Sequence, residues 1–149
     1  MSATGTAATI ELLERFHAAT NSGDPEVLAK AMDEFVAPDV DFHPPVPIGG
    51  LSGREALKLV WETLLRAFPD IHVSIEETVA EGDRVVSRNR VTGTHSGEFQ
   101  GLPATGRTVD YGEIFILRVA DGRITEIRGV VDALTQLRQL GLLPPAGRP

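Results

Sequence analysis

From residue 71 onward, apolar and polar side chains alternate through four long segments, and this period of two limits the possible folds most. The segments are residues 71–80, 84–95, 109–119 and 123–131. Such alternation is typical of strands with one covered face. The Asp121-Gly122 pair between the last two segments is a strong signal for a tight hairpin. The pattern predicts an antiparallel meander, and strands of about 35 Å must twist and coil.

Helical spacing dominates the chain before this meander. Apolar residues recur every three or four positions in 10–20, in 25–38 and in 53–68. We expect Asp24 to cap the second helix and Pro38 to stop it, and a Ser52–Glu55 capping box to begin the third. A short strand at 40–43, a proline-rich loop at 44–47 and a last helix at 133–140 complete the predicted elements. Helices followed by an antiparallel meander predict an α+β fold, in which helices cover one face of a curved sheet and leave a cone-shaped pocket.

Composition excludes several functions. The chain has 149 residues, 42% of them hydrophobic, which suits a single domain spanning 1–149 with loose ends at 1–6 and 144–149. The net charge of −7 argues against binding to nucleic acid or anionic membranes. There is no cysteine and no apolar run long enough to cross a membrane. We expect no secretory signal, because the first ten residues lack a basic start and an apolar core. We therefore expect a cytoplasmic protein without a metal site.

Several motifs point to a known family. They are Ala80–Val86, Thr92–Phe99, Gly101–Arg107, Asp121–Glu126, Asp132 and Gln139–Gly141. Together they resemble the SnoaL-like polyketide cyclases of the NTF2-like superfamily, from about Ile10 to Leu142. The resemblance implies a cone with helices on the concave face of its sheet, and a homodimer or homotetramer paired through the outer face. It also implies an ester cyclase or isomerase of secondary metabolite biosynthesis, acting on a small hydrophobic carbonyl substrate without cofactor or metal.

Asp132 is the leading candidate for proton transfer, because the family's acid/base aspartate falls on this position. Alternation along 123–132 places it on one face with Arg128, which would stabilise its ionised form. The alternatives are structural. Asp132 could cap the last helix, and Arg128 could be a surface residue whose stem covers the sheet.

A second group of candidates shares one face of the strand at 109–119. Glu113 alternates there with Tyr111 and Phe115, which suggests that this face is covered. A register one residue away would instead place Glu113 in solvent. On the neighbouring strand, Asn89 is expected to orient a substrate carbonyl or a water molecule.

Further candidates come from other segments. His43 and His95 are expected near the pocket, where each could orient a substrate oxygen, and His17 is expected to be structural. Trp61 and Phe16 are expected to line the cavity. Two alternative functions stay open: epoxide opening as in limonene epoxide hydrolase-like relatives, using Asn89 with Arg128 and Asp132, and a non-catalytic ligand-binding domain.

Overall fold

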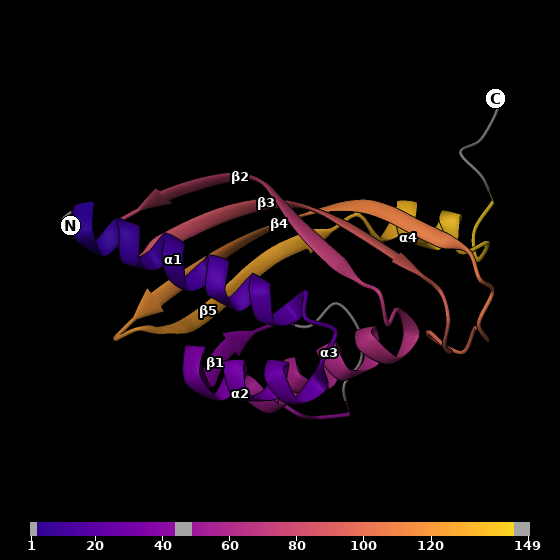
Figure 1. The fold of residues 1–149 in the computed structure, drawn as a ribbon, viewed down its shortest axis with the longest axis horizontal. Helices are drawn as coiled ribbons and strands as arrows, with labels where there is room; N and C mark the ends of the chain where they lie inside the picture. Colours follow the sequence, from indigo (N-terminus) through magenta and orange to yellow (C-terminus); the bar gives the residue numbers. More distant parts are fainter. Residues whose placement is uncertain (1–2, 44–48, 145–149) are drawn as a thin grey trace.

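A five-stranded sheet forms the body of the molecule (Figure 1). The structure, a computed structural model, describes residues 3–43 and 49–144. The strands are β1 (Val36–Phe42), β2 (His72–Glu81), β3 (Arg84–Thr94), β4 (Thr108–Ala120) and β5 (Arg123–Val131). Their order is β1-β5-β4-β3-β2, and the predicted meander of β2 to β5 is antiparallel throughout.

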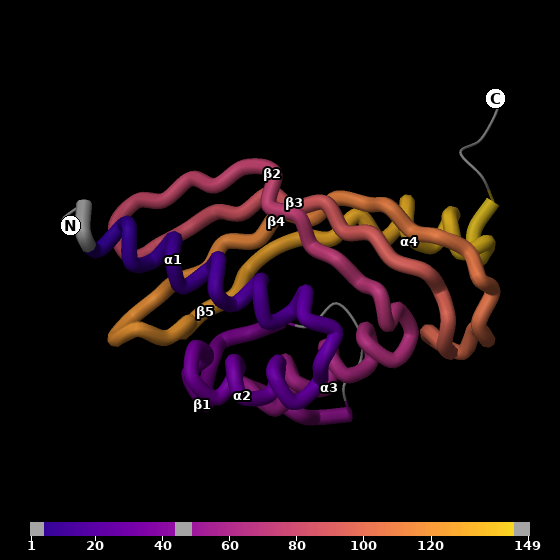
Figure 2. The backbone as a smooth tube through the Cα atoms, in the orientation of Figure 1, coloured from indigo at the N-terminus to yellow at the C-terminus, as the bar shows by residue number. Residues whose placement is uncertain are grey.

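The helices are α1 (Ala3–Thr20), α2 (Pro25–Phe35), α3 (Gly53–Ala67) and α4 (Ala133–Gln139). α1, α2 and α3 lie on one side of the curved sheet. In Figure 2 the turns of the β2–β3 and β4–β5 hairpins and the start of α1 lie at one end of the molecule, and α4 lies at the other. The α+β class and the helix-covered sheet are confirmed.

Helix caps follow the sequence in part. Asp24 caps α2 as predicted, because its Oδ1 accepts a hydrogen bond from the Glu26 N–H at 2.9 Å. Ser52 occupies the N-cap position of α3, but its side chain makes no capping hydrogen bond. The capping box therefore predicts the start of α3 correctly, but the predicted capping hydrogen bond of Ser52 is absent.

The region around Pro38 differs from the prediction. α2 ends at Phe35 rather than at Pro38, and the chain continues directly into β1. β1 is longer than the predicted strand and runs parallel to β5, with an irregular register between Val36 and Asp41. An edge strand tolerates proline because one side of its backbone has no strand partner. Pro38 is therefore compatible with a strand at this position.

The hairpin between β4 and β5 has the predicted two-residue turn. Asp121 and Gly122 have φ angles of 52° and 75°. Positive φ at both central residues is the type I′ arrangement that matches strand twist. This turn fixes the register beside it, where Ala120 pairs with Arg123.

The chain ends agree only partly with expectation. α1 already begins at Ala3, so most of the expected loose start at 1–6 is helical. The expected loop at 44–47 lies outside the described residues, as does the expected loose end at 144–149 apart from residue 144. Among the helices described, none is long and apolar enough to span a bilayer.

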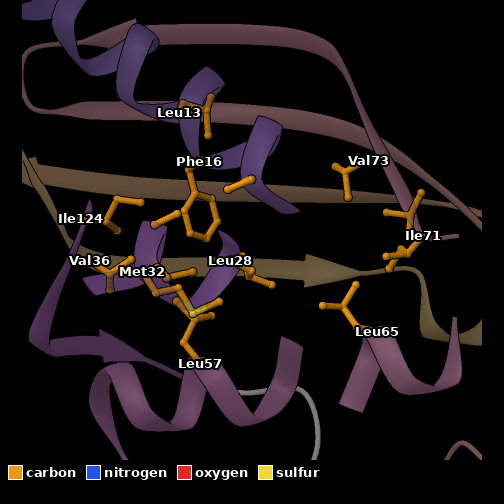
Figure 3. Close-up of a cluster of buried hydrophobic side chains, with 14 of the residues drawn as sticks. Leu13, Phe16, Leu28, Met32, Val36, Leu57, Leu65, Ile71, Val73 and Ile124 are labelled. Carbon is orange, nitrogen blue, oxygen red and sulfur yellow. The ribbon is translucent and has the colours of Figure 1, made fainter. Parts of the chain in front are cut away.

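The main core lies between the three helices and the sheet, as Figure 3 shows. Phe16 of α1 points from the helix towards Met32 of α2 and Ile124 of β5. Met32 and Ile124 are almost completely buried, and Leu57 of α3 is buried in the same core cluster. This packing fixes α1 and α3 over the sheet, and the space beyond it remains open as a cavity.

Candidate active site

A cavity of about 170 Å³ lies between the inner face of the sheet and the helices. Its wall is mostly apolar and combines side chains from three helices with side chains from β3, β4 and β5. The lining residues used below are Phe16, His17, Trp61, Ser87, Asn89, Tyr111, Glu113, Phe115, Val131, Ala133 and Gln136. A largely apolar cavity with a few grouped polar side chains is the usual form of a small-molecule site.

Glu113 is the carboxyl group of this cavity. It lies directly opposite Asn89 in the β3–β4 ladder, and Asn89 Nδ2 donates a hydrogen bond to Glu113 Oε1 at 3.1 Å. Ser87 Oγ in turn donates to Asn89 Oδ1, and both of these residues are buried. The hydrogen bonds from Ser87 to Asn89 and from Asn89 to Glu113 fix Oε1 of Glu113 as an acceptor. They leave Oε2 for other partners.

The surroundings of Glu113 favour its protonated form. Burial raises the pKa of the Glu113 carboxyl, and the hydrogen bond from Asn89 opposes that rise. A carboxyl with a raised pKa exchanges protons more readily near neutral pH than an ordinary surface carboxylate does. Glu113 therefore has the environment expected of a proton-transfer group.

The other polar members of the wall are Tyr111 and His17. Burial and the charge of Glu113 raise the pKa of the Tyr111 hydroxyl, while hydrogen bonding with the Gln136 side chain acts in the opposite direction. Burial lowers the pKa of His17 to about 4, so its ring is neutral at neutral pH. The Nδ1 atom of His17 is buried without a hydrogen-bond partner.

All six residues predicted to contact substrate lie in this wall. They are Asn89, Glu113, Trp61, Phe16, Tyr111 and Phe115. The predicted register of β4 is confirmed, since Tyr111, Glu113 and Phe115 all face the cavity. The exposed residues Ile114 and Ile116 alternate with them on the outer face.

Asp132 lies at the cavity rim rather than in its wall. Val131 and Ala133 line the cavity on either side of it, but the Asp132 side chain is exposed and caps α4. Its two oxygens accept from the Thr135 N–H at 3.1 Å and the Thr135 hydroxyl at 2.7 Å. These hydrogen bonds hold the pKa of Asp132 below its usual range, and the bond from the Thr135 hydroxyl has the largest effect.

Arg128 was expected to face the cavity, but it lies outside the cavity wall. Its guanidinium donates to Asp41 Oδ2 at 2.7 Å, and its side chain is 41% exposed. A bulge in the β4–β5 ladder explains the difference. Val119 pairs with Ile124 beside the turn, but Arg118 pairs with Glu126, so Thr125 is an extra residue.

The bulge changes which residues of β5 face inward. Beyond it Glu113 pairs with Val131, so Val131 shares the inner face with Glu113. Without the extra residue, Val130 would occupy that position and Arg128 and Asp132 would alternate with it on the inner face. The sequence prediction assumed a regular ladder and was therefore wrong about the face of Arg128.

The two histidines expected near the pocket also lie outside its wall. His43 is exposed at the end of β1, with its Nε2 at 3.3 Å from Asp41 Oδ1. His95 is fully buried, its Nδ1 accepts from the Thr105 N–H at 3.2 Å, and its ring packs against Phe68. The aromatic and loop contacts of His95 indicate a role in holding the 95–107 loop against α3.

Three polar residues of the wall were not predicted as site residues. His17 belongs to the apolar stripe of its helix, and this spacing was the signal that its side chain faces inward. Alternation places Ser87 on the same strand face as Asn89, two residues away, but no role in the site was predicted for it. Gln136 gave no signal, because the position of α4 against the cavity depends on tertiary packing.

No group of acidic and histidine side chains within residues 3–43 and 49–144 is arranged to hold a metal ion.

The fold and the cavity define a class of proteins in which helices close a curved sheet into a cone around a ligand site. The family model for the SnoaL-like polyketide cyclases matches residues 10–140. The chain therefore belongs to the SnoaL-like polyketide cyclase family.

Individual relatives agree with this assignment. The chain is 32% identical over 134 residues to the aklanonic acid methyl ester cyclase DnrD of Streptomyces peucetius, covering 89% of this chain and 90% of DnrD. Among solved structures, a proposed SnoaL-like polyketide cyclase of Jannaschia sp. CCS1 is 25% identical, with a TM-score of 0.82 and coverage of 97% and 99%. AclR of Streptomyces galilaeus, a proposed hydroxylase, is 30% identical, with a TM-score of 0.80 and coverage of 96% and 87%.

Proposed function

We propose that this protein is a cofactor-free acid/base cyclase that closes a ring in a polyketide-like carbonyl compound by intramolecular aldol addition. The observation that carries the proposal is Glu113, a buried carboxyl in an apolar cavity, oriented by Asn89. Similarity to the aklanonic acid methyl ester cyclases supports the substrate class.

The proposed reaction needs one group that both takes and returns a proton. The Glu113 carboxylate removes a proton from the carbon beside a carbonyl, and the C–H electron pair forms the enolate. The enolate carbon then attacks a second carbonyl of the same molecule. The alkoxide that results takes the proton back from Glu113, so no net proton is gained or lost.

Asp132 is the alternative proton-transfer group, because the family resemblance implies it. Its exposed carboxylate is already occupied with Thr135, and reaching a substrate would require it to give up the cap. The epoxide-opening alternative gains no support. It needs Asn89, an arginine and a carboxylate at one point, and Arg128 is paired with Asp41 instead.

The first half of the reaction can be tested without knowing the true substrate. Methyl benzoylacetate is a small β-keto ester whose α-protons exchange with deuterium when an enolate forms, and NMR measures that exchange. We expect the wild-type protein to accelerate exchange and Glu113→Gln to lose at least about 100-fold of that rate. Cyclisation of aklanonic acid methyl ester would then test the complete reaction.

A matched control separates the site from general effects of charge removal. Glu77 lies on β2, is exposed and pairs with Arg88, so Glu77→Gln removes the same charge away from the cavity. We expect this variant to keep the wild-type exchange rate. Exchange by Glu113→Gln at the wild-type rate would refute the assignment of Glu113.

A further inference from the structure

Tyr111 and Glu113 are neighbours on the inner face of β4. They are two residues apart, so their side chains leave the same side of the strand, and both line the cavity. Tyr111 is only 7% exposed. A ligand oxygen that gains negative charge close to Glu113 would therefore lie in the same cavity as the Tyr111 hydroxyl.

The hydroxyl of Tyr111 is a hydrogen-bond donor at neutral pH. Burial and the nearby Glu113 charge raise its pKa, so the phenol keeps its proton. Hydrogen bonding with the Gln136 side chain acts against that rise without reversing it. Because the phenol keeps its proton and lines the cavity beside Gln136, Tyr111 has an O–H that can donate to a ligand there.

The fold fixes Gln136 in this role. Gln136 is 6% exposed, and its backbone N–H donates to the Asp132 carbonyl at 3.2 Å in the first turn of α4. Gln139 ties the same helix to β4, because its side chain bonds the Asp110 N–H at 2.7 Å and the Asp110 carbonyl at 2.9 Å. The two hydrogen bonds of Gln139 thus hold α4 against β4, the strand that carries Tyr111.

We propose that Tyr111, oriented by Gln136, is the donor that binds the enolate oxygen of the substrate. This inference rests on the proposed function, because the enolate arises when Glu113 takes the proton. The negative charge then moves from the Glu113 carboxylate to the enolate oxygen, and it remains within the cavity that both residues line. A fixed donor aimed at the atom that gains charge stabilises the transition state without reorganisation. The site should therefore bind planar enols and phenols in their ionised form.

2-Naphthol is a suitable probe, because its neutral and ionised forms absorb differently. The Glu113→Gln variant carries a neutral side chain, as Glu113 does after accepting the proton. We expect this variant to bind 2-naphthol as the naphtholate. Adding Tyr111→Phe should weaken binding by about 10- to 100-fold, the range for a hydrogen bond to a charged group. Adding Gln136→Leu instead should weaken it less.

The control ligand is 2-methoxynaphthalene, which has the same rings and cannot ionise. We expect Glu113→Gln and Tyr111→Phe/Glu113→Gln to bind it equally well. Equal binding of 2-naphthol by these two variants would overturn the proposal. An equal loss of both ligands on adding Tyr111→Phe would also overturn it, because Tyr111 would then act through packing. Deuterium exchange remains the separate test of Glu113, so the two proposals can fail independently.

Discussion

Asp132 shows how one side chain can satisfy a structural role completely. Its two carboxylate oxygens both bind Thr135, and its carbonyl accepts from Gln136, so the residue organises the whole first turn of α4. These contacts explain its presence without any catalytic role. They also connect it to the cavity, because the turn it caps carries Gln136.

Two substitutions of Asp132 separate these roles. Asp132→Asn keeps a capping oxygen, so we expect near-normal thermal stability and a deuterium-exchange rate close to wild type. Asp132→Ala removes the cap and should cost about 1 kcal/mol of unfolding free energy. Chemical denaturation and the NMR exchange assay measure the two effects. A loss of about 100-fold or more in Asp132→Asn, with stability unchanged, would transfer the proton-transfer role from Glu113 to Asp132.

At the scale of elements, the β4–β5 hairpin determines the composition of the cavity wall. Gly129 pairs with Phe115 across this hairpin. A Cβ atom at Gly129 would lie 2.4 Å from the Ile114 carbonyl oxygen and 2.5 Å from Phe115 Cδ1. The absence of a side chain at Gly129 therefore makes room for the ring of Phe115, which lines the cavity.

We expect Gly129→Ala to destabilise the protein by about 1–3 kcal/mol, the usual range for overpacking. Gly112→Ala is the matched control, because a Cβ there would lie 3.8 Å from the Asn89 carbonyl oxygen, an ordinary contact. Urea denaturation of the two variants measures the difference. Equal midpoints would show that Phe115 can move without cost.

Sequence reasoning succeeded where a regular repeat determines structure. The period of two placed Asn89, Tyr111 and Glu113 on the inner faces of β3 and β4, because those strands pair without interruption. It failed for Arg128, because the extra residue at Thr125 reverses the faces of β5 and leaves no clear mark in the sequence. The parallel pairing of β1 was also missed, since it joins segments far apart in the chain.

At the scale of the whole molecule, the outer face of the sheet carries exposed apolar side chains on β4 and β5. Ile114, Ile116 and Val130 are 42%, 42% and 70% exposed there. β4 and β5 are neighbours and Ile114 pairs with Val130, so these side chains form one patch. Charged pairs lie on the same face, including Arg90 with Asp110. An apolar patch with charges of both signs suits association with a second copy of the chain.

We therefore propose a homodimer formed through this face and expect light scattering at micromolar concentration to show a particle of twice the chain mass. Ile114→Glu should shift the protein to monomer, because it places a charge within the apolar patch. Val27→Glu is the control, since Val27 is 44% exposed on α2, away from the sheet. A wild-type particle of 16.0 kDa would contradict the proposal.

Trp61 is the one tryptophan of the chain, and it lies in the wall of the cavity. Indole emission depends on the polarity of the surroundings. A molecule that enters the cavity replaces solvent beside this ring, and no second tryptophan contributes to the signal. The unlabelled protein thus carries its own optical reporter of occupancy. Its intrinsic fluorescence can screen candidate carbonyl compounds before any product is identified.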